Sequence, residues 1–258
     1  MNNLIKNFPD NKNIFHREFT VRYSEVNKFG IFKLQSIFDC LQQIAAEHAN
    51  FLGFGMQSLY SKNMIWVLSK MSLKIYGNFS PEQKITVCTY PSGVERVFFR
   101  REFEISDSAS GEVLAHASSY WLLLDSIKLR PLRRSVLDGV QLENPELPVF
   151  IPQFPPEPDN ANLEENILSF DIRFSQTDIN QHLNNAQYAA MTEDVLFEKL
   201  QKSFNIKEIH VSFLQAQKYP DRLTWAADIK KSGEFYLTGS NIDNNNTAFS
   251  AYGICITE

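Results

Sequence analysis

The pattern of hydrophobic and polar positions predicts two similar units along the chain. Each unit opens with a strand-like run, residues 17–23 in the first and residues 167–174 in the second. A helix is predicted next: apolar residues recur at helical spacing between Leu34 and His48, and residues 184–200 favour helix by composition. Four strand-like runs follow each helix, at 64–76, 84–90, 96–106 and 113–125, and at 208–216, 222–231, 234–242 and 248–257. We therefore predict a strand, a long helix and an antiparallel meander, twice.

A direct comparison of the two units supports an internal duplication. A shift of 151 residues, the separation of Arg22 and Arg173, places "VRYSEVNKFGIFKLQ" over "IRFSQTDINQHLNNA". Ser24 then falls on Ser175, and the match lies where the two strand-to-helix junctions should coincide. Six of the eleven prolines stand between Pro145 and Pro158, so this segment is predicted to cross the surface as an extended linker. The predicted division is residues 1–142, a linker at 143–162, and residues 163–258.

Composition narrows the class of protein. Hydrophobic residues make up 43% of the chain and charged residues 21%, as in an ordinary globular protein. A formal net charge of −5 argues against a nucleic-acid binder, which would normally be basic. We find neither a signal-peptide pattern nor an apolar run of membrane-spanning length, so we expect a cytoplasmic protein without membrane insertion.

Reactive motifs of the common cofactor and hydrolase classes are not found. The three cysteines, Cys40, Cys88 and Cys255, lie far apart in apolar contexts and are interpreted as reduced core residues. The sequence contains no G-x-S-x-G elbow, phosphate-binding loop or dinucleotide glycine motif. We therefore predict no cofactor.

The stretch "TDINQHLNNAQY", residues 177–188, is the main candidate for chemistry because it gathers Asp178, Asn180 and His182 at alternate positions. In an extended segment these side chains would share one side, and in a helix only Asp178 and His182 would meet. Three interpretations compete: a polar turn with Asn184 as helix N-cap, a metal site, and a catalytic site. A metal site is disfavoured because no second His or Cys lies near His182.

The duplication locates this chemistry in the second unit. The first unit has Asn27, Phe29 and Ile31 at the corresponding positions, so its junction is largely apolar. A helix start offers backbone N–H groups that can stabilise an oxyanion, which together with a base and an amide makes the parts of an acyl hydrolase. The capping-turn and catalytic interpretations both remain open.

Two further sets of polar residues allow two interpretations each. His48 lies on the apolar stripe of the first helix and is either a core histidine with its hydrogen bonds satisfied or the border of a pocket. Arg96, Arg100, Arg101 and residues 128–134 form either a solvated face or a docking patch for an acidic carrier protein.

"DINQHLNNAQY" resembles the D-x-N-x-H-V-N-N-x-x-Y motif of the acyl-acyl carrier protein thioesterases. "LQQIAAEHANFLGFG", "NMIWVLSKMSLKIY" and "GEVLAHASSYWLLLDSIKLRP" are similar to further segments of that family, so the resemblance covers nearly the whole chain from about residue 15. It implies an α+β double hot-dog fold, in which two long central helices are each wrapped by an antiparallel sheet.

The resemblance also implies an activity. The family hydrolyses the thioester that joins a fatty acyl chain to acyl carrier protein, and its catalytic aspartate, asparagine and histidine fall on Asp178, Asn180 and His182. The first unit would supply the acyl-chain pocket. Acyl carrier protein is the expected partner, and a homodimer is left open. The alternatives are a thioesterase acting on acyl-coenzyme A and an acyl-binding protein without catalysis.

The chain departs from the family pattern at two positions. The family often carries a glutamate on the strand after the second helix, and here that position falls on Ala216, or on Gln215 or Gln217 with a slip of one residue. Met191 stands where the second helix of the family has tryptophan. Three hypotheses follow: Asp178 and His182 suffice, Glu193 substitutes as the base, or acyl groups are bound without turnover.

Overall fold

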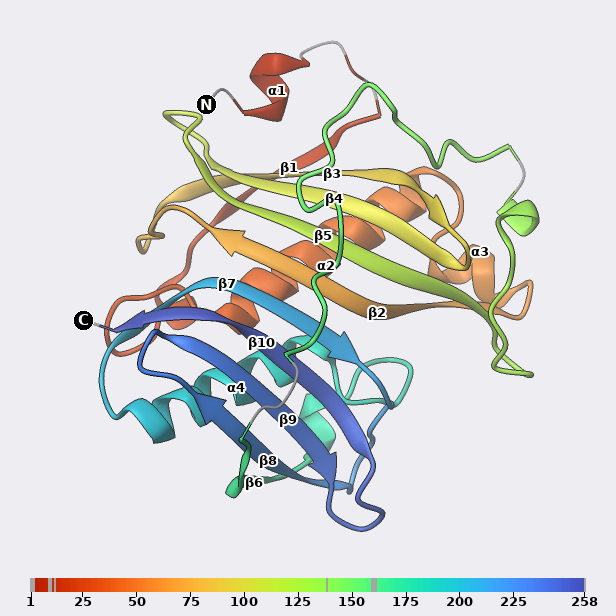
Figure 1. Ribbon diagram of the computed structural model, residues 1–258. Coiled ribbons are helices and arrows are strands. Elements are labelled where there is room, and N and C mark those ends of the chain that lie inside the picture. The colour runs from red at the N-terminus through yellow and green to blue at the C-terminus, as the bar shows by residue number, and fades with distance from the viewer. Residues whose placement is uncertain (1–2, 9–10, 12, 138, 159–161, 258) are drawn as a thin grey trace.

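One continuous antiparallel sheet of ten strands runs through the whole molecule (Figure 1). The computed structural model describes residues 3–8, 11, 13–137, 139–158 and 162–257. The strands of the first unit are β1 (Phe15–Thr20), β2 (Met64–Ile75), β3 (Lys84–Glu95), β4 (Phe98–Asp107) and β5 (Val113–Asp125). Those of the second unit are β6 (Glu164–Asp171), β7 (Phe204–Phe213), β8 (Arg222–Ile229), β9 (Glu234–Asn241) and β10 (Thr247–Thr257).

The strand order shows that the two units are related by a pseudo-twofold axis. The order is β1-β3-β4-β5-β2 followed by β7-β10-β9-β8-β6, so the second half repeats the strand order of the first in reverse from the β2–β7 junction. At that junction Ser72 lies opposite His210 in an antiparallel ladder. The described helices are α1 (Leu4–Asn7), α2 (Leu34–Phe51), α3 (Met56–Tyr60) and α4 (Asn185–Leu200), with single 3₁₀ turns η1 (Tyr23–Glu25), η2 (Arg134–Leu137) and η3 (Phe174–Gln176).

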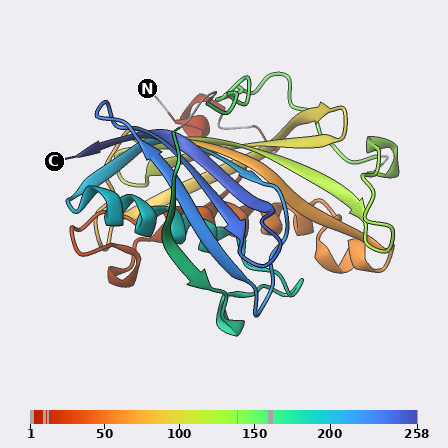
Figure 2. The ribbon, with the colours of Figure 1, turned by 60° about the horizontal axis from the view of Figure 1, so that its bottom comes forward.

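The two long helices pack side by side on the same side of the curved sheet (Figure 2). They are antiparallel, because the start of α2 meets the middle of α4 at Glu193, and the start of α4 meets the middle of α2 at Gln42. This arrangement confirms the two predicted helices and the α+β architecture. No helix among the described residues is both long and apolar enough to cross a membrane.

Burial of apolar faces explains why the helices lie where they do. The stripe of α2 that includes Ile37, Leu41 and Ile44 is almost completely buried, and Ala186 and Ala189 give α4 a small face that lies against the sheet. Residues of both units form one continuous core cluster. Each fully buried Leu or Ile side chain contributes roughly 1.5–3 kcal/mol, so the shared core stabilises the two units together.

The structure differs from the sequence prediction at the ends of elements. The predicted strands at 17–23 and 167–174 end early, in η1 and η3, because Glu25 and Gln176 side chains accept the N–H groups of Arg22 and Arg173 and turn the chain. The short helices α1 and α3 were not predicted, since four or five residues are too few to show helical periodicity. The three cysteines are free and buried, which confirms their core interpretation.

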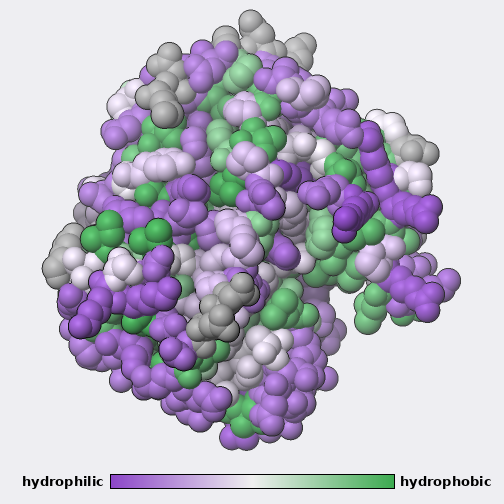
Figure 3. All heavy atoms as spheres, viewed as in Figure 1, coloured by the Kyte–Doolittle hydropathy of each residue, from purple (hydrophilic) through white to green (hydrophobic). Residues whose placement is uncertain are grey.

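The proline-rich segment crosses the outer face of the sheet and is bound to it. Tyr90 Oη donates a hydrogen bond to the Pro148 carbonyl, and Tyr252 Oη donates one to the Pro155 carbonyl. The Phe154 ring packs against the rings of Tyr120 and His210. The division at residues 143–162 remains a prediction, and Figure 3 shows the face that this segment covers.

Candidate active site

Residues 177–183 form a compact turn, so neither the extended nor the helical geometry considered from the sequence applies. Thr177 and Leu183 form an isolated bridge, and the Asp178 N–H donates to the His182 carbonyl at 2.7 Å. Gln181 adopts a left-handed conformation with φ 64° at the tip of the turn. Alternate side chains therefore do not share one side.

The carboxylate of Asp178 holds this turn together. Its Oδ1 accepts hydrogen bonds from the backbone N–H groups of Asn180 at 2.8 Å and His182 at 3.2 Å. Its Oδ2 receives, from the described residues, only a long contact of 3.4 Å from Asn180 Nδ2. One oxygen is thus occupied by backbone, and the other remains available to a ligand.

The first unit contains the same turn, formed around Asn27. Asn27 Oδ1 accepts hydrogen bonds from Phe29 N at 2.9 Å and Ile31 N at 3.1 Å, and Gly30 takes the left-handed position with φ 77°. An acceptor at this position therefore serves the fold in both units. The sequence prediction that a polar junction is confined to the second unit is wrong for Asp178. It holds for Asn180 and His182.

The comparison also isolates what is special about Asp178. The turn requires a single acceptor oxygen, which the neutral amide of Asn27 supplies. The negative charge and the second oxygen of Asp178 are not needed for the turn. They are additions of the second unit.

The starts of the two long helices differ in a way that matters for an oxyanion. Asn184 is the N-cap of α4 and its side chain accepts from Ala186 N at 2.8 Å, which confirms the predicted cap. Within the described residues, the Asn185 N–H has no acceptor. In the first unit, the equivalent Leu34 N–H donates to Glu193 Oε2 at 3.0 Å. The backbone donor is thus open at α4 and occupied at α2.

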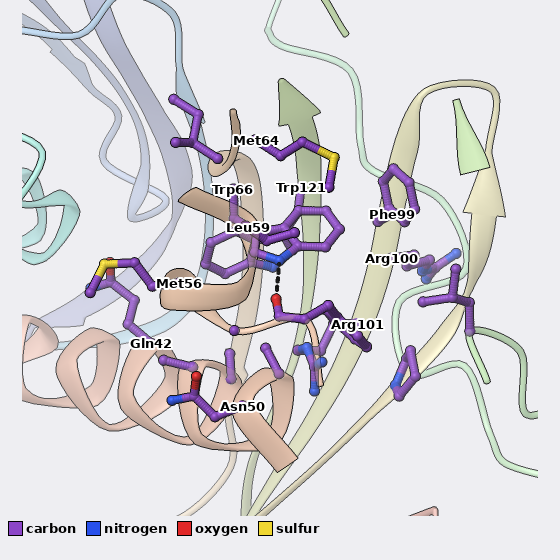
Figure 4. A pocket seen from close by; sticks show the side chains of 18 of the residues that line it. Gln42, Asn50, Met56, Leu59, Met64, Trp66, Phe99, Arg100, Arg101 and Trp121 are labelled. Carbon is purple, nitrogen blue, oxygen red and sulfur yellow. Dashed lines mark hydrogen bonds between the residues drawn. The ribbon is translucent and has the colours of Figure 1, made fainter. Parts of the chain in front are cut away.

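A cavity of about 260 Å³ lies beside this turn, mainly inside the first unit (Figure 4). Its wall is largely apolar and includes Leu59, Trp66, Phe99 and Trp121. Asn180 of the second unit is exposed and borders the cavity. Tyr60 Oη of α3 donates a hydrogen bond to Asn180 Oδ1, so α3 fastens the turn to the cavity wall.

His182 borders a different cavity. Its neighbours there include Gln215, Ala216, Gln217 and Asp221, in a space of about 410 Å³. The His182 side chain is exposed, and its imidazole has no hydrogen-bond partner in the part of the chain that the structure describes. The structure therefore brings Asp178 and Asn180 into contact, while His182 borders the second cavity together with Ala216.

The position of the missing family glutamate, Ala216, is exposed and borders the cavity of His182, and the next residue, Gln217, is a neutral, buried amide. Gln217 is 2% exposed, its carbonyl accepts from Leu183 N at 2.7 Å, and its Oε1 accepts from Asn241 Nδ2 at 2.7 Å. Asp221 shares the cavity of His182, and its charge contributes to the raised pKa of the buried Tyr188 phenol, which burial raises most. Asp221 belongs to no motif in the sequence, so its place beside His182 could not be predicted.

Glu193 is half-buried and borders neither of these two cavities. Its carboxylate caps the start of α2 through Leu34 N, and burial raises its pKa to about 7. Glu193 occupies the position in α4 that Gln42 occupies in α2, 151 residues earlier. Gln42 in turn borders the cavity of Asn180 and accepts a 3.4 Å contact from Asn185 Nδ2.

The basic residues divide into two groups. Arg101 is buried, and Arg100 is paired with Glu102 at 2.8 Å, so including these two in an exposed docking patch was wrong. The segment 127–134 is different: it exposes Ile127 and Leu129 together with the basic side chains Lys128, Arg130, Arg133 and Arg134. We call this segment the basic lobe. Figure 3 shows hydrophilic and hydrophobic residues side by side on the right of the molecule, where this part of the chain lies in Figure 1.

His48 is a core residue with a satisfied ring. It is 2% exposed, its Nδ1 lies 2.9 Å from Arg101 Nη1, and its ring stacks on Phe15 at 5.2 Å. This confirms the core interpretation. Over the described residues, no group of three or more His, Cys, Asp and Glu is arranged to hold a metal ion.

Family models match most of the chain. The model of the acyl-ACP thioesterase N-terminal domain matches residues 12–139, and that of the C-terminal domain matches residues 160–254. The chain belongs to the acyl-ACP thioesterase family. It is 25% identical over 249 residues to oleoyl-acyl carrier protein thioesterase 2 of Arabidopsis thaliana, covering 88% of this chain and 66% of that protein. It is 26% identical over 190 residues to a palmitoyl-acyl carrier protein thioesterase of Cuphea hookeriana, covering 68% and 45%.

Solved structures of this family share the fold. An acyl-ACP thioesterase of Bacteroides thetaiotaomicron superposes with a TM-score of 0.80 at 21% identity, covering 95% of this chain and 98% of that one. The 12:0-ACP thioesterase of Umbellularia californica gives 0.77 at 16% identity, covering 96% and 99%. The α+β double hot-dog fold is thereby confirmed. The chain spans between about half and two thirds of the length of the two curated plant relatives.

Proposed function

We propose that this acyl-ACP thioesterase family member hydrolyses the thioester of fatty acyl-acyl carrier protein and releases free fatty acid and holo-carrier. One observation carries the proposal: an apolar cavity ends at Asn180, on the turn of Asp178 and next to a helix start whose first N–H group is open. In the first unit the corresponding positions hold Phe29, Asn27 and a helix start capped by Glu193. The family membership and the names of the relatives support the same activity.

In the proposed reaction, water attacks the thioester carbonyl carbon, the C–S bond breaks, and the thiolate of the pantetheine arm leaves. Asp178 Oδ2, the oxygen not used by the turn, accepts the proton of the attacking water. Asn180 Nδ2 and the Asn185 N–H stabilise the carbonyl oxygen as it becomes negative. A thiolate is a good leaving group, so the demand on a general acid is modest.

His182 acts from the neighbouring cavity in this proposal. Asp221 shares that cavity and provides a carboxylate where the family pattern would place a glutamate near Ala216. A carboxylate in the same cavity offers an acceptor that can orient the imidazole ring. His182 and Asp221 then assist Asp178 in activating the water.

We propose acyl carrier protein as the partner and the basic lobe as its docking surface. Four exposed cations gathered on one segment, with exposed Ile127 and Leu129 between them, suit an acidic protein with a small apolar contact. The basic lobe follows β5, which contributes Trp121 to the cavity wall, so a carrier bound there is near the cavity. The cytoplasmic location and a homodimer stay predictions.

A second candidate function is the binding of acyl groups without turnover. The observation that favours it is Ala216, a neutral position beside His182, whose ring lacks a partner among the described residues. Thiol release from a panel of acyl-carrier-protein and acyl-coenzyme A thioesters of varied chain length separates the candidates. Release from the carrier thioesters supports the proposal, and faster release from coenzyme A thioesters would identify acyl-coenzyme A as the substrate class instead. No release from either supports acyl binding without turnover.

A further inference from the structure

A buried cation with no carboxylate partner among the described residues borders the cavity. Arg101 stands on β4, is 7% exposed, and belongs to the cavity wall (Figure 4). The hydrogen bonds that its guanidinium makes to described residues both come from Nη1, which donates to His48 Nδ1 at 2.9 Å and to Thr89 Oγ1 at 3.1 Å. Both acceptors are neutral, because burial and the Arg101 charge lower the pKa of His48 to about 3.

The remaining donors of Arg101 have no acceptor in the described part of the chain. Nε and Nη2 of a guanidinium carry three of its five N–H groups. No described carboxylate lies within ion-pair distance of Arg101, although burial lowers its pKa only to about 10 and leaves it charged at neutral pH. The neighbouring Arg100 is the opposite case, since its Nε donates to Glu102 at 2.8 Å and its two Nη atoms donate to the carbonyls of Pro152 and Ile151.

This arrangement becomes costly once water is excluded from the cavity. A buried charge is tolerated when it is paired and its donors are satisfied, and the penalty for leaving it unpaired is severe. Holding His48 and Thr89 in place uses only Nη1. A plain hydrocarbon chain in the cavity would exclude water from the remaining N–H groups and offer them nothing in return.

We propose that the cavity takes acyl chains that carry an acceptor oxygen on the segment lying against Arg101. The shared chemistry is a hydrogen-bond acceptor inside an otherwise apolar chain, and a hydroxyl or a carboxylate at the distal end supplies it. This inference rests on the proposed function, because it names the substrate class of the same cavity. Charge-assisted hydrogen bonds of a guanidinium discriminate strongly against a chain that lacks the oxygen.

The test compares carrier thioesters of equal length that end in a methyl, a hydroxyl or a carboxylate group. The wild-type protein should prefer one oxygenated member over the methyl member by about tenfold or more in kcat/KM at its best chain length. Arg101→Met should abolish or reverse that preference, and Arg101→Lys should retain part of it for the carboxylate. Preference for the hydroxyl alone indicates hydrogen bonding, and preference for the carboxylate indicates ion pairing.

Arg100 also borders the cavity, but its donors are already occupied by Glu102 and by carbonyls, so Arg100→Met is the matched control. This variant should leave the ratio between oxygenated and plain chains unchanged. A ratio measured within one variant is insensitive to the fraction of folded protein. A wild-type preference for methyl-ended chains at every length, unaltered by Arg101→Met, would overturn the inference.

A binding measurement keeps the inference testable if no thioester is hydrolysed. Calorimetric titration with methyl esters of plain and ω-hydroxy fatty acids should show tighter binding of the hydroxy ester to the wild-type protein, and equal binding to Arg101→Met. Together with an absence of thioester hydrolysis, that result supports the inference although the proposed catalysis has failed. Equal binding of both esters to the wild-type protein refutes the inference and leaves the proposed hydrolysis untouched.

Discussion

Substituting Asp178 by Asn separates the structural role of this residue from a catalytic one. The first unit shows that the turn tolerates an amide, because Asn27 makes the same two hydrogen bonds at 2.9 and 3.1 Å that Asp178 makes at 2.8 and 3.2 Å. Asp178→Asn therefore keeps the acceptor oxygen and removes only the charge and the second carboxylate oxygen.

The two roles predict effects of different size. Charged acceptors contribute up to about 1–2 kcal/mol more than neutral ones in buried sites, and this turn is partly exposed, so the stability cost should be about 1 kcal/mol or less. For a chain of this size, that corresponds to a fall in Tm of roughly 2–4 °C. Loss of a general base should lower kcat by about 10²–10⁴-fold.

The assay is thiol release from the best carrier thioester, with thermal unfolding measured on the same preparations. Asn27→Asp is the matched control: it introduces the carboxylate into the first-unit turn and should change kcat by no more than about twofold. If Asp178→Asn turns over substrate at the wild-type rate, Asp178 only forms the turn, and the proposed mechanism fails.

Three further predictions concern other parts of the site. The folded-state pKa of Glu193 is raised to about 7, so its contribution to stability is complete below about pH 4.5 and is lost as the pH rises through 7. Glu193→Gln should therefore flatten the dependence of the unfolding free energy on pH, measured by urea titration from pH 5 to 8. An unchanged slope would contradict this prediction. Ala216→Glu should change kcat by no more than about twofold, because Asp221 already provides a carboxylate in the cavity of His182, and a rise of about tenfold or more would contradict this role of Asp221. Charge reversal at Arg130 and Arg133 should raise KM for carrier thioesters, less so at high salt, and the same reversal at Lys231 in the second unit should not; equal effects at both places would remove the basic lobe as the docking surface.

The architecture could be predicted because the same hydrophobic pattern occurs twice along the chain, once in each unit. The register found from Arg22 and Arg173 continues through the structure: Gly30 and Gln181 both occupy the left-handed tip of a turn, and Leu34 and Asn185 both begin a long helix. Strand alternation and the two amphipathic or small-residue helix faces then leave few ways to bury the apolar residues.

The details of the site could not be predicted, because they depend on where side chains point after the backbone turns. Residues 178, 180 and 182 alternate in sequence, but the turn directs Asn180 and His182 into different cavities. Arg100 and Arg101 look like one basic pair in the sequence, but neighbouring residues of a strand point to opposite sides of the sheet. Arg100 lies under the proline-rich segment, whereas Arg101 faces α2. Tyr60 was missed because α3 is too short for its periodicity to show.

The hydrogen bond between Tyr60 and Asn180 joins the wall of the cavity to the turn in which we propose the chemistry, and the two come from different copies of the duplicated unit. The size and polarity of the cavity can therefore change by substitutions in one copy, while the Asp178 turn in the other copy stays unchanged. A single hot-dog unit that pairs with itself has no such freedom, since each change alters both sites at once. Duplication in one chain thus lets selection alter what is accepted separately from what is done to it.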